Sequence, residues 1–109
     1  MATAYKVLGQ VAPSATTATT VYTVPSATSA VVSSVAVCNR AGTAATFRLS
    51  VRPDGASLAN EHYLVYDANL DANDTIIFTI GVTMDANDVL EGYASSGDVT
   101  FHAYGSEIS

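Results

Sequence analysis

Four oxygen-bearing side chains at alternate positions form the strongest chemical pattern in this 109-residue sequence: Asp67, Asn69, Asp71 and Asn73. Carboxylate and amide oxygens are the ligands that Ca²⁺ prefers, and this spacing resembles the opening of a calcium-binding loop. The rest of that loop is missing, because Ala72 replaces the glycine of the sharp turn and Phe78 replaces the bidentate glutamate. We therefore expect no metal and no other cofactor, with a weak calcium site at these four residues as the alternative.

The remaining reactive residue types show no catalytic spacing. His62 and His102 fall on predicted strands, but a catalytic zinc ion usually needs three protein ligands. Cys38 is the only cysteine, which excludes an intrachain disulfide and favours the role of a small buried apolar residue. Serines are abundant, but none lies in a G-x-S-x-G nucleophile elbow. We predict that the protein is not an enzyme.

Aromatic and basic residues point to binding instead. Six tyrosines outnumber three phenylalanines, and there is no tryptophan. Tyrosine suits positions that are packed at one end and wet at the other, as on the face of a sheet or at a protein interface. Two arginines share one face of a predicted strand, where they can meet an acidic partner or the acidic residues of the chain itself. The candidate interface residues are Tyr5, Arg48, Arg52 and Tyr104.

Short alternating apolar runs, separated by Gly, Pro, Asn, Asp and Ser, indicate the elements that position these residues. The low-charge composition, rich in Val and Thr, also suits pleated sheet. Strands are predicted over residues 5–11, 21–24, 30–38, 47–52, 62–67, 75–80, 89–94 and 99–104. We expect one all-β domain over 1–109, a small β-sandwich or jelly-roll-like barrel of about eight short antiparallel strands, with a short N-terminal arm at 1–4.

Three details of this arrangement follow from the pattern. The run 30–38 is apolar on both faces and is predicted to be central. One of its faces is predicted to carry three valines, Val31, Val35 and Val37. The last two strands are predicted to form a hairpin around Ser95–Asp98. The repeated Asp-Ala-Asn-Asp at 71–74 and 85–88 indicates two turns, in which asparagine tolerates left-handed backbone geometry.

Charge and hydropathy limit the classes of partner. Ten acidic and four basic residues give a formal net charge of −6, which argues against nucleic acid and against electrostatic binding to a membrane. No apolar stretch reaches the length of about 18 residues that a membrane span requires, and the opening residues lack the pattern of a signal peptide. Charged residues make up 13% of the chain, so its strand edges have little protection and association with neighbours is favoured.

Three segments of the chain resemble segments of a known group of proteins: Thr3–Gln10 (TAYKVLGQ), Asn60–Tyr63 (NEHY) and Ala103–Ser109 (AYGSEIS). In them the chain resembles small all-β virion structural proteins of tailed phages, especially those that infect cyanobacteria. The resemblance implies a role in the phage particle, and it marks no functional residue.

Together these observations predict a phage virion structural protein, foremost a capsid decoration (cement) protein that stabilises the head by binding capsid subunits. Its expected partners are the major capsid protein and further copies of itself, in a homo-oligomer for which a trimer is one arrangement. It would be made in the host cytoplasm and reside in the virion. The alternative is a tail, baseplate or fibre component that binds host-surface glycans. A small enzyme or sugar-binding module is a third reading, against which the lack of Trp and of catalytic spacing argues.

Overall fold

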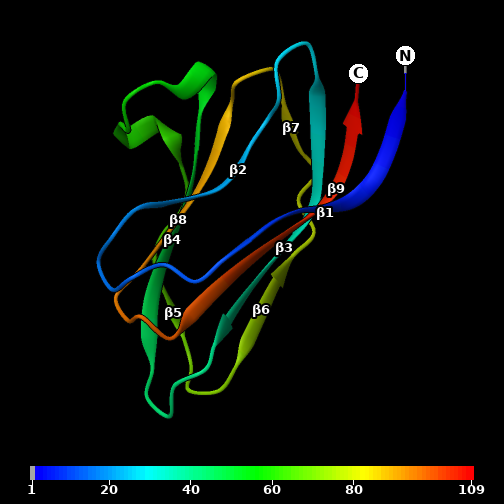
Figure 1. The fold of residues 1–109 in the computed structure, drawn as a ribbon. Helices are drawn as coiled ribbons and strands as arrows, with labels where there is room; N and C mark the ends of the chain where they lie inside the picture. Colours follow the sequence, from blue (N-terminus) through cyan, green and yellow to red (C-terminus); the bar gives the residue numbers. More distant parts are fainter. Residues whose placement is uncertain (1) are drawn as a thin grey trace.

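The computed structural model describes residues 2–109, which form two antiparallel β-sheets packed face to face (Figure 1). The first sheet contains, in order, β1 (Thr3–Val11), β9 (Val99–Ile108), β3 (Ser29–Asn39) and β6 (Thr75–Phe78), and β7 (Val82–Met84) also pairs with β3. The second sheet contains, in order, β2 (Thr19–Thr23), β8 (Val89–Ala94), β4 (Ala45–Arg52) and β5 (Tyr63–Leu70). Two short 3₁₀ turns, Pro53–Gly55 and Asn60–His62, lie between β4 and β5.

Strands that are distant in the sequence pair in a nested order. β1 pairs with β9, β2 with β8, β3 with β6 and β7, and β4 with β5. Nested antiparallel pairs divided between two sheets make a jelly roll. The predicted all-β sandwich is therefore confirmed, and its two sheets stay open rather than closing into a barrel.

The core lies between the two sheets, because side chains alternate along each strand and one face of each sheet is apolar. Phe47 of β4 and Phe101 of β9 are fully buried, and their rings meet edge to face with 6.3 Å between centroids. On β8, a Cβ atom at Gly92 would come within 2.9 Å of the Phe101 ring. Glycine at this position therefore lets a phenylalanine of one sheet pack directly onto the backbone of the other.

β3 is central, as predicted, but the predicted placing of Val31 is wrong. The register between β3 and β9 shifts between Val32 and Ser34, which leaves Ser33 as an extra residue in a β-bulge. The extra residue reverses the alternation, so Val32 is fully buried and Val31 turns to the outer face. Cys38, expected to be buried, is only half-buried because Val37 takes the inward position next to it.

The predicted hairpin of the last two strands is also wrong. β8 lies between β2 and β4 in the second sheet, whereas β9 lies between β1 and β3 in the first. Both edges of β8 are already paired, so no edge of it is left for β9. Residues 95–98 instead carry the chain from one sheet to the other.

The two ends of the described chain lie side by side (Figure 1). Ala2 and Ser109 exchange two backbone hydrogen bonds of 2.8 and 2.9 Å, and Ala4 pairs with Glu107. Residues 2–4 therefore belong to a β-ladder rather than to a free arm, and Met1 lies outside the described residues.

Residues 2–109 contain no helix of the length and apolarity needed to cross a bilayer.

Candidate interaction surfaces

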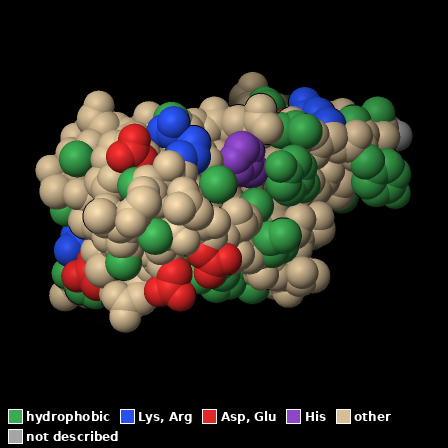
Figure 2. Space-filling view, turned by 90° about the horizontal axis from the view of Figure 1, so that it is seen from below, with side chains coloured by type: hydrophobic (Ala, Val, Ile, Leu, Met, Phe, Trp, Pro, Cys, Tyr) green, Lys and Arg blue, Asp and Glu red, His purple; other side chains and the backbone are tan. Residues whose placement is uncertain are grey.

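One end of the first sheet projects from the sandwich, and we call it the tip. It consists of residues 3–7 of β1 and the antiparallel residues 104–108 of β9. The molecule measures 45 × 27 × 20 Å, and the tip is its narrow end, where Figure 2 shows hydrophobic side chains on the surface. Tyr5 is 85% exposed and Val7 50% exposed. Large apolar side chains are thus held in solvent on a strand that the rest of residues 2–109 leaves exposed.

The inner face of the tip is tied to the second sheet through Glu107. Its Oε1 lies 2.7 Å from Nζ of Lys6, and the hydroxyl of Tyr22 on β2 donates a 2.6 Å hydrogen bond to Oε2. The hydrogen bond from Lys6, and then that from Tyr22, hold the pKa of Glu107 below its ordinary value. Burial, and then Glu107, raise the pKa of the Tyr22 hydroxyl. The polar groups of this inner face are therefore satisfied within the chain.

The outer face of the tip contains a hollow of about 360 Å³, lined by Tyr5, Lys6, Val31, Ser33, Tyr104, Gly105 and Ser106. The bulge at Ser33 brings β3 so close to β9 that a Cβ atom on Gly105 would lie 1.9 Å from the Val31 carbonyl oxygen. Only glycine fits there without displacing the backbone. The structure thus brings Tyr5 and Tyr104, two of the predicted interface residues, to one hollow.

A second surface lies on the outer face of the second sheet, and we call it the arginine–tyrosine cluster: Arg48, Tyr63, Tyr66, Asp67 and Tyr93. The Arg48 guanidinium carbon lies 4.3 Å from the ring centroids of both Tyr66 and Tyr93. Tyr63 packs edge-on against Tyr66, with 4.8 Å between centroids. Tyr63, Tyr66 and Asn60 line a hollow of about 270 Å³.

Asp67 completes the cluster by accepting hydrogen bonds from Nε of Arg48 at 2.7 Å and from Nη2 at 3.3 Å. Consecutive residues of a regular strand point to opposite faces, yet Tyr66 and Asp67 both contact Arg48. This is achieved by shifts in the β4–β5 register and by a left-handed φ of 51° at Asp67, a β-bulge that redirects the side chains. The hydrogen bond from Arg48 lowers the pKa of Asp67.

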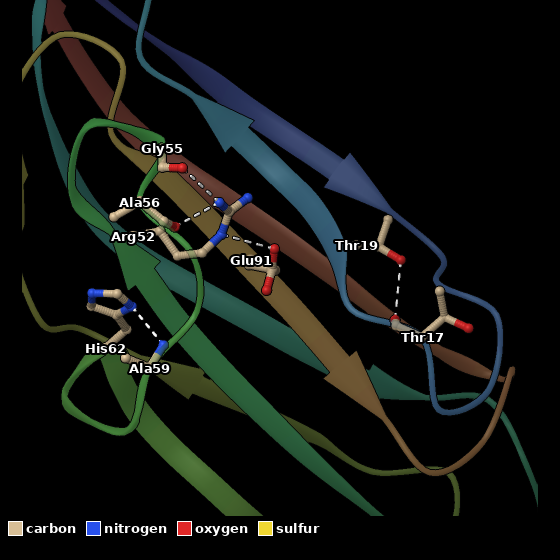
Figure 3. Close-up of polar contacts among 8 residues, drawn as sticks. All are labelled: Thr17, Thr19, Arg52, Gly55, Ala56, Ala59, His62 and Glu91. Carbon is tan, nitrogen blue, oxygen red and sulfur yellow. Dashed lines mark hydrogen bonds and ion pairs between the residues drawn. The ribbon is translucent and has the colours of Figure 1, made fainter.

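Arg52, predicted as an interface residue, bonds to other groups of the same chain (Figure 3). Its Nε lies 3.1 Å from Oε2 of Glu91 on β8, and its Nη1 donates to the carbonyl oxygens of Gly55 at 3.2 Å and Ala56 at 2.9 Å. The side chains of Arg52 and Glu91 are only 19% and 10% exposed. Arg52 therefore holds the connection that follows β4 against the sheet.

The two histidines lie in different parts of the molecule. His62 is in the 3₁₀ turn rather than on the predicted strand, and its Nδ1 accepts a 3.0 Å hydrogen bond from the Ala59 amide (Figure 3). His102 is on β9, as predicted, where its nitrogens lie 3.2 Å from Nε2 of Gln10 and from Oγ1 of Thr100. Each imidazole is thus part of a separate local network.

The residues of the calcium-like pattern lie in different local settings. Asp67 is ion-paired with Arg48, Asn69 is exposed on β5, and Asp71 and Asn73 belong to the turn that follows. Within residues 2–109, no three His, Cys, Asp or Glu side chains are close enough together to hold a metal ion. The ion pair with Arg48 leaves Asp67 poorly placed to serve as a cation ligand.

The two Asp-Ala-Asn-Asp segments form turns of the predicted kind. Asn73 and Asn87 have φ values of 55° and 69°, so the prediction of left-handed asparagines is confirmed. Asp88 accepts 2.8 Å hydrogen bonds from the amides of Asp85 and Asp54. These acidic side chains close turns, which gives the repeat a structural role.

Sequence reasoning missed the partners that fix each surface. Glu107, Tyr93 and Glu91 were not singled out, because each takes part through a neighbour that is distant in the sequence. For Glu107 and Glu91, the available signal was an acidic residue within a predominantly apolar or uncharged strand.

No protein-family model and no curated protein sequence matches the chain.

Proposed function

We propose that this chain is a structural protein of a phage particle, foremost a capsid decoration protein that binds the major capsid protein and further copies of itself. The proposal rests on the exposed side chains of the tip. It presents Tyr5 and Val7 to solvent beside a hollow of about 360 Å³. Exposed aromatic and aliphatic side chains on a narrow projection favour contact with another protein, because such contact removes their apolar surface from water.

The arginine–tyrosine cluster supplies a second region for contact. A protein that clamps neighbouring capsid subunits needs at least two such regions on one rigid body. The cluster and the tip lie on different sheets of the sandwich. Tyrosine and arginine are enriched at protein interfaces, and in the cluster Arg48 is already held in place by two rings and a carboxylate. Such an ordered side chain loses little further conformational freedom on binding.

The jelly-roll architecture supports a virion role only by analogy. Viral capsid domains and lectins both use this arrangement of strands, so the fold is compatible with a particle protein and with a glycan-binding one.

The alternative function is that of a tail, baseplate or fibre component that binds host-surface glycans. The hollow of about 270 Å³ beside Tyr63, Tyr66 and Asn60 favours it. Tyrosine rings offer apolar faces against which a sugar ring can pack, and an amide can both donate to and accept from its hydroxyl groups.

The two functions are separated by the copy number of the protein in purified virions of the encoding phage, measured by quantitative mass spectrometry. Hundreds of copies in a simple ratio to the major capsid protein are expected for decoration. A few copies per particle would overturn it in favour of the tail location, and a glycan array with wild type and Tyr66→Ala would then test the hollow.

Capsid binding gives a second test of the decoration role. Ligands that bind only the native state stabilise it. Adding this protein to capsids that lack it should therefore raise the temperature at which the capsids rupture. Equal rupture temperatures with and without the protein would contradict the proposal.

A further inference from the structure

β1 is the outermost strand of the first sheet, and its residues 3–7 are all exposed. β9 pairs with one side of β1. Along residues 3–7 the other side is not paired with any strand of residues 2–109, so a row of backbone donors and acceptors is left open.

The hydrogen-bond pattern shows to which residues these open N–H and C=O groups belong. Ala2 and Ser109 exchange both of their backbone hydrogen bonds, and such pairs alternate with unbonded pairs along an antiparallel ladder. The register with β9 is unbroken from Thr3 to Val7. Ala4 and Lys6 therefore bond to β9, whereas the N–H and C=O groups of Thr3, Tyr5 and Val7 point away from it.

The side chains of this segment do not protect the edge. Strand edges are usually protected by bulges, prolines or free lysines. The segment has no proline, and its register shift comes only after Val7. Its one charged residue, Lys6, is neutralised by Glu107 at 2.7 Å. The edge is thus free of bulges, locally neutral and flanked by the exposed side chains of Tyr5 and Val7.

We propose that this edge pairs antiparallel with the same edge of a second copy of the chain, around a two-fold axis at Tyr5. In this register Tyr5 faces Tyr5 of the second copy, and Thr3 faces Val7. Each of these pairs exchanges two backbone hydrogen bonds, so all the outward groups of Thr3, Tyr5 and Val7 on both copies are satisfied. The first sheets of the two copies would then form one continuous sheet.

A second copy fits this edge because the open groups are self-complementary. They are placed symmetrically about Tyr5, as a two-fold interface requires. On the outer face the pairing brings Tyr5 against Tyr5 and covers Val7 with Thr3, while on the other face Ala4 rather than Lys6 stands opposite each Lys6. The pairing specifies how the further copies in the proposed function bind, and because it involves only this chain it can be tested without capsids.

Sedimentation of the full chain over a range of concentrations tests the pairing. Wild type is expected to pass from monomer to dimer. Tyr5→Pro removes an outward N–H that β9 does not use, and proline is tolerated at such edge positions. It should raise the dimer dissociation constant at least about tenfold. Ile77→Ala is the matched control, since Ile77 is 66% exposed on β6, and it should leave the constant unchanged.

Amide hydrogen exchange of the wild-type chain provides a test that needs no variant. As concentration rises, the amides of Thr3, Tyr5 and Val7 should gain protection, whereas those of Ala4 and Lys6, already bonded to β9, should change little. The proposal is overturned by a chain that stays monomeric, by a trimer, or by a dimer in which the outward amides gain no protection. None of these outcomes depends on the copy number in virions.

Discussion

β1 and β5 each form the outer strand of a sheet, but their free edges differ in how well they are protected from further pairing. The pairing of β5 with β4 is interrupted by two register shifts, and Asp67 adopts left-handed backbone geometry to reach Arg48. Residues 3–7 of β1 keep an unbroken register and full exposure. β5 thus carries the bulges that protect a strand edge from pairing with other chains, and this part of β1 carries none.

This difference separates polar side chains that bond to one another from backbone groups that are left open. In the second sheet the polar side chains of Arg48, Arg52 and their acidic partners satisfy one another, so their loss should reduce the stability of the monomer. At the edge of β1 the open backbone groups make no bond to any other part of residues 2–109. Changes there should affect association and leave the monomer intact.

The largest effect is expected at Gly105 of the tip, where β9 lies close to the backbone of β3. Gly105→Ala would place a Cβ atom 1.9 Å from a backbone oxygen, so the strands must separate. We expect the free energy of unfolding to fall by about 3 kcal/mol, the upper end for overpacking, in a denaturant titration. Gly42→Ala is the control, because its Cβ atom would meet nothing within 4 Å. Equal losses in the two variants would contradict the close approach.

The next largest effect is expected at Arg52 in the second sheet. Arg52→Ala leaves the carboxylate of Glu91, a residue only 8% exposed, without its partner. The free energy of unfolding should fall by about 2 kcal/mol, the cost of an unsatisfied polar group in a poorly hydrated site. The double variant Arg52→Ala, Glu91→Gln should recover part of the loss in the same titration. No recovery would mean that Arg52 acts through its bonds to the following connection.

A smaller loss of folding stability is expected at low pH, and it should involve both the tip and the arginine–tyrosine cluster. The pKa values of Glu107 at the tip and of Asp67 in the cluster are lowered in the folded state. Their contribution to stability is therefore complete above the ordinary carboxyl values and is lost as the pH falls through the folded values. Unfolding monitored from about pH 6 to about pH 3 should show declining stability, and Glu107→Gln should flatten the curve. An unchanged slope in that variant would exclude Glu107 as a source.

The smallest effect on stability is expected at the most exposed aromatic residue of the tip. Tyr5→Ala should change the free energy of unfolding of the dilute monomer by less than about 0.5 kcal/mol, as is usual for surface positions. The same variant should weaken binding to capsids if the tip is the contact surface. A large loss of monomer stability would show that the Tyr5 side chain supports the fold, and the contrast between β1 and β5 would then fail.

The sequence by itself determined the class of the fold and much of its local chemistry. Arg48 and Arg52 share the outer face of their strand, as predicted, and Phe47 and Leu49 on the opposite face are buried, because alternation depends only on neighbouring residues. The left-handed asparagines of the two turns were predictable for the same reason, since the asparagine side chain acts on its own backbone. The sequence also indicated an all-β chain with poorly protected edges.

Only the tertiary structure decided which strands are neighbours. The division of β8 and β9 between two sheets and the bond between Ala2 and Ser109 join segments that no local pattern relates. A single extra residue at Ser33 places Val31 on the face opposite Val35 and Val37, and the sequence pattern contains no mark of it. Strand pairing is set by hydrogen bonds between distant segments and by the packing of one sheet on the other, so the open edge of β1 could be recognised only after every strand had found its partner.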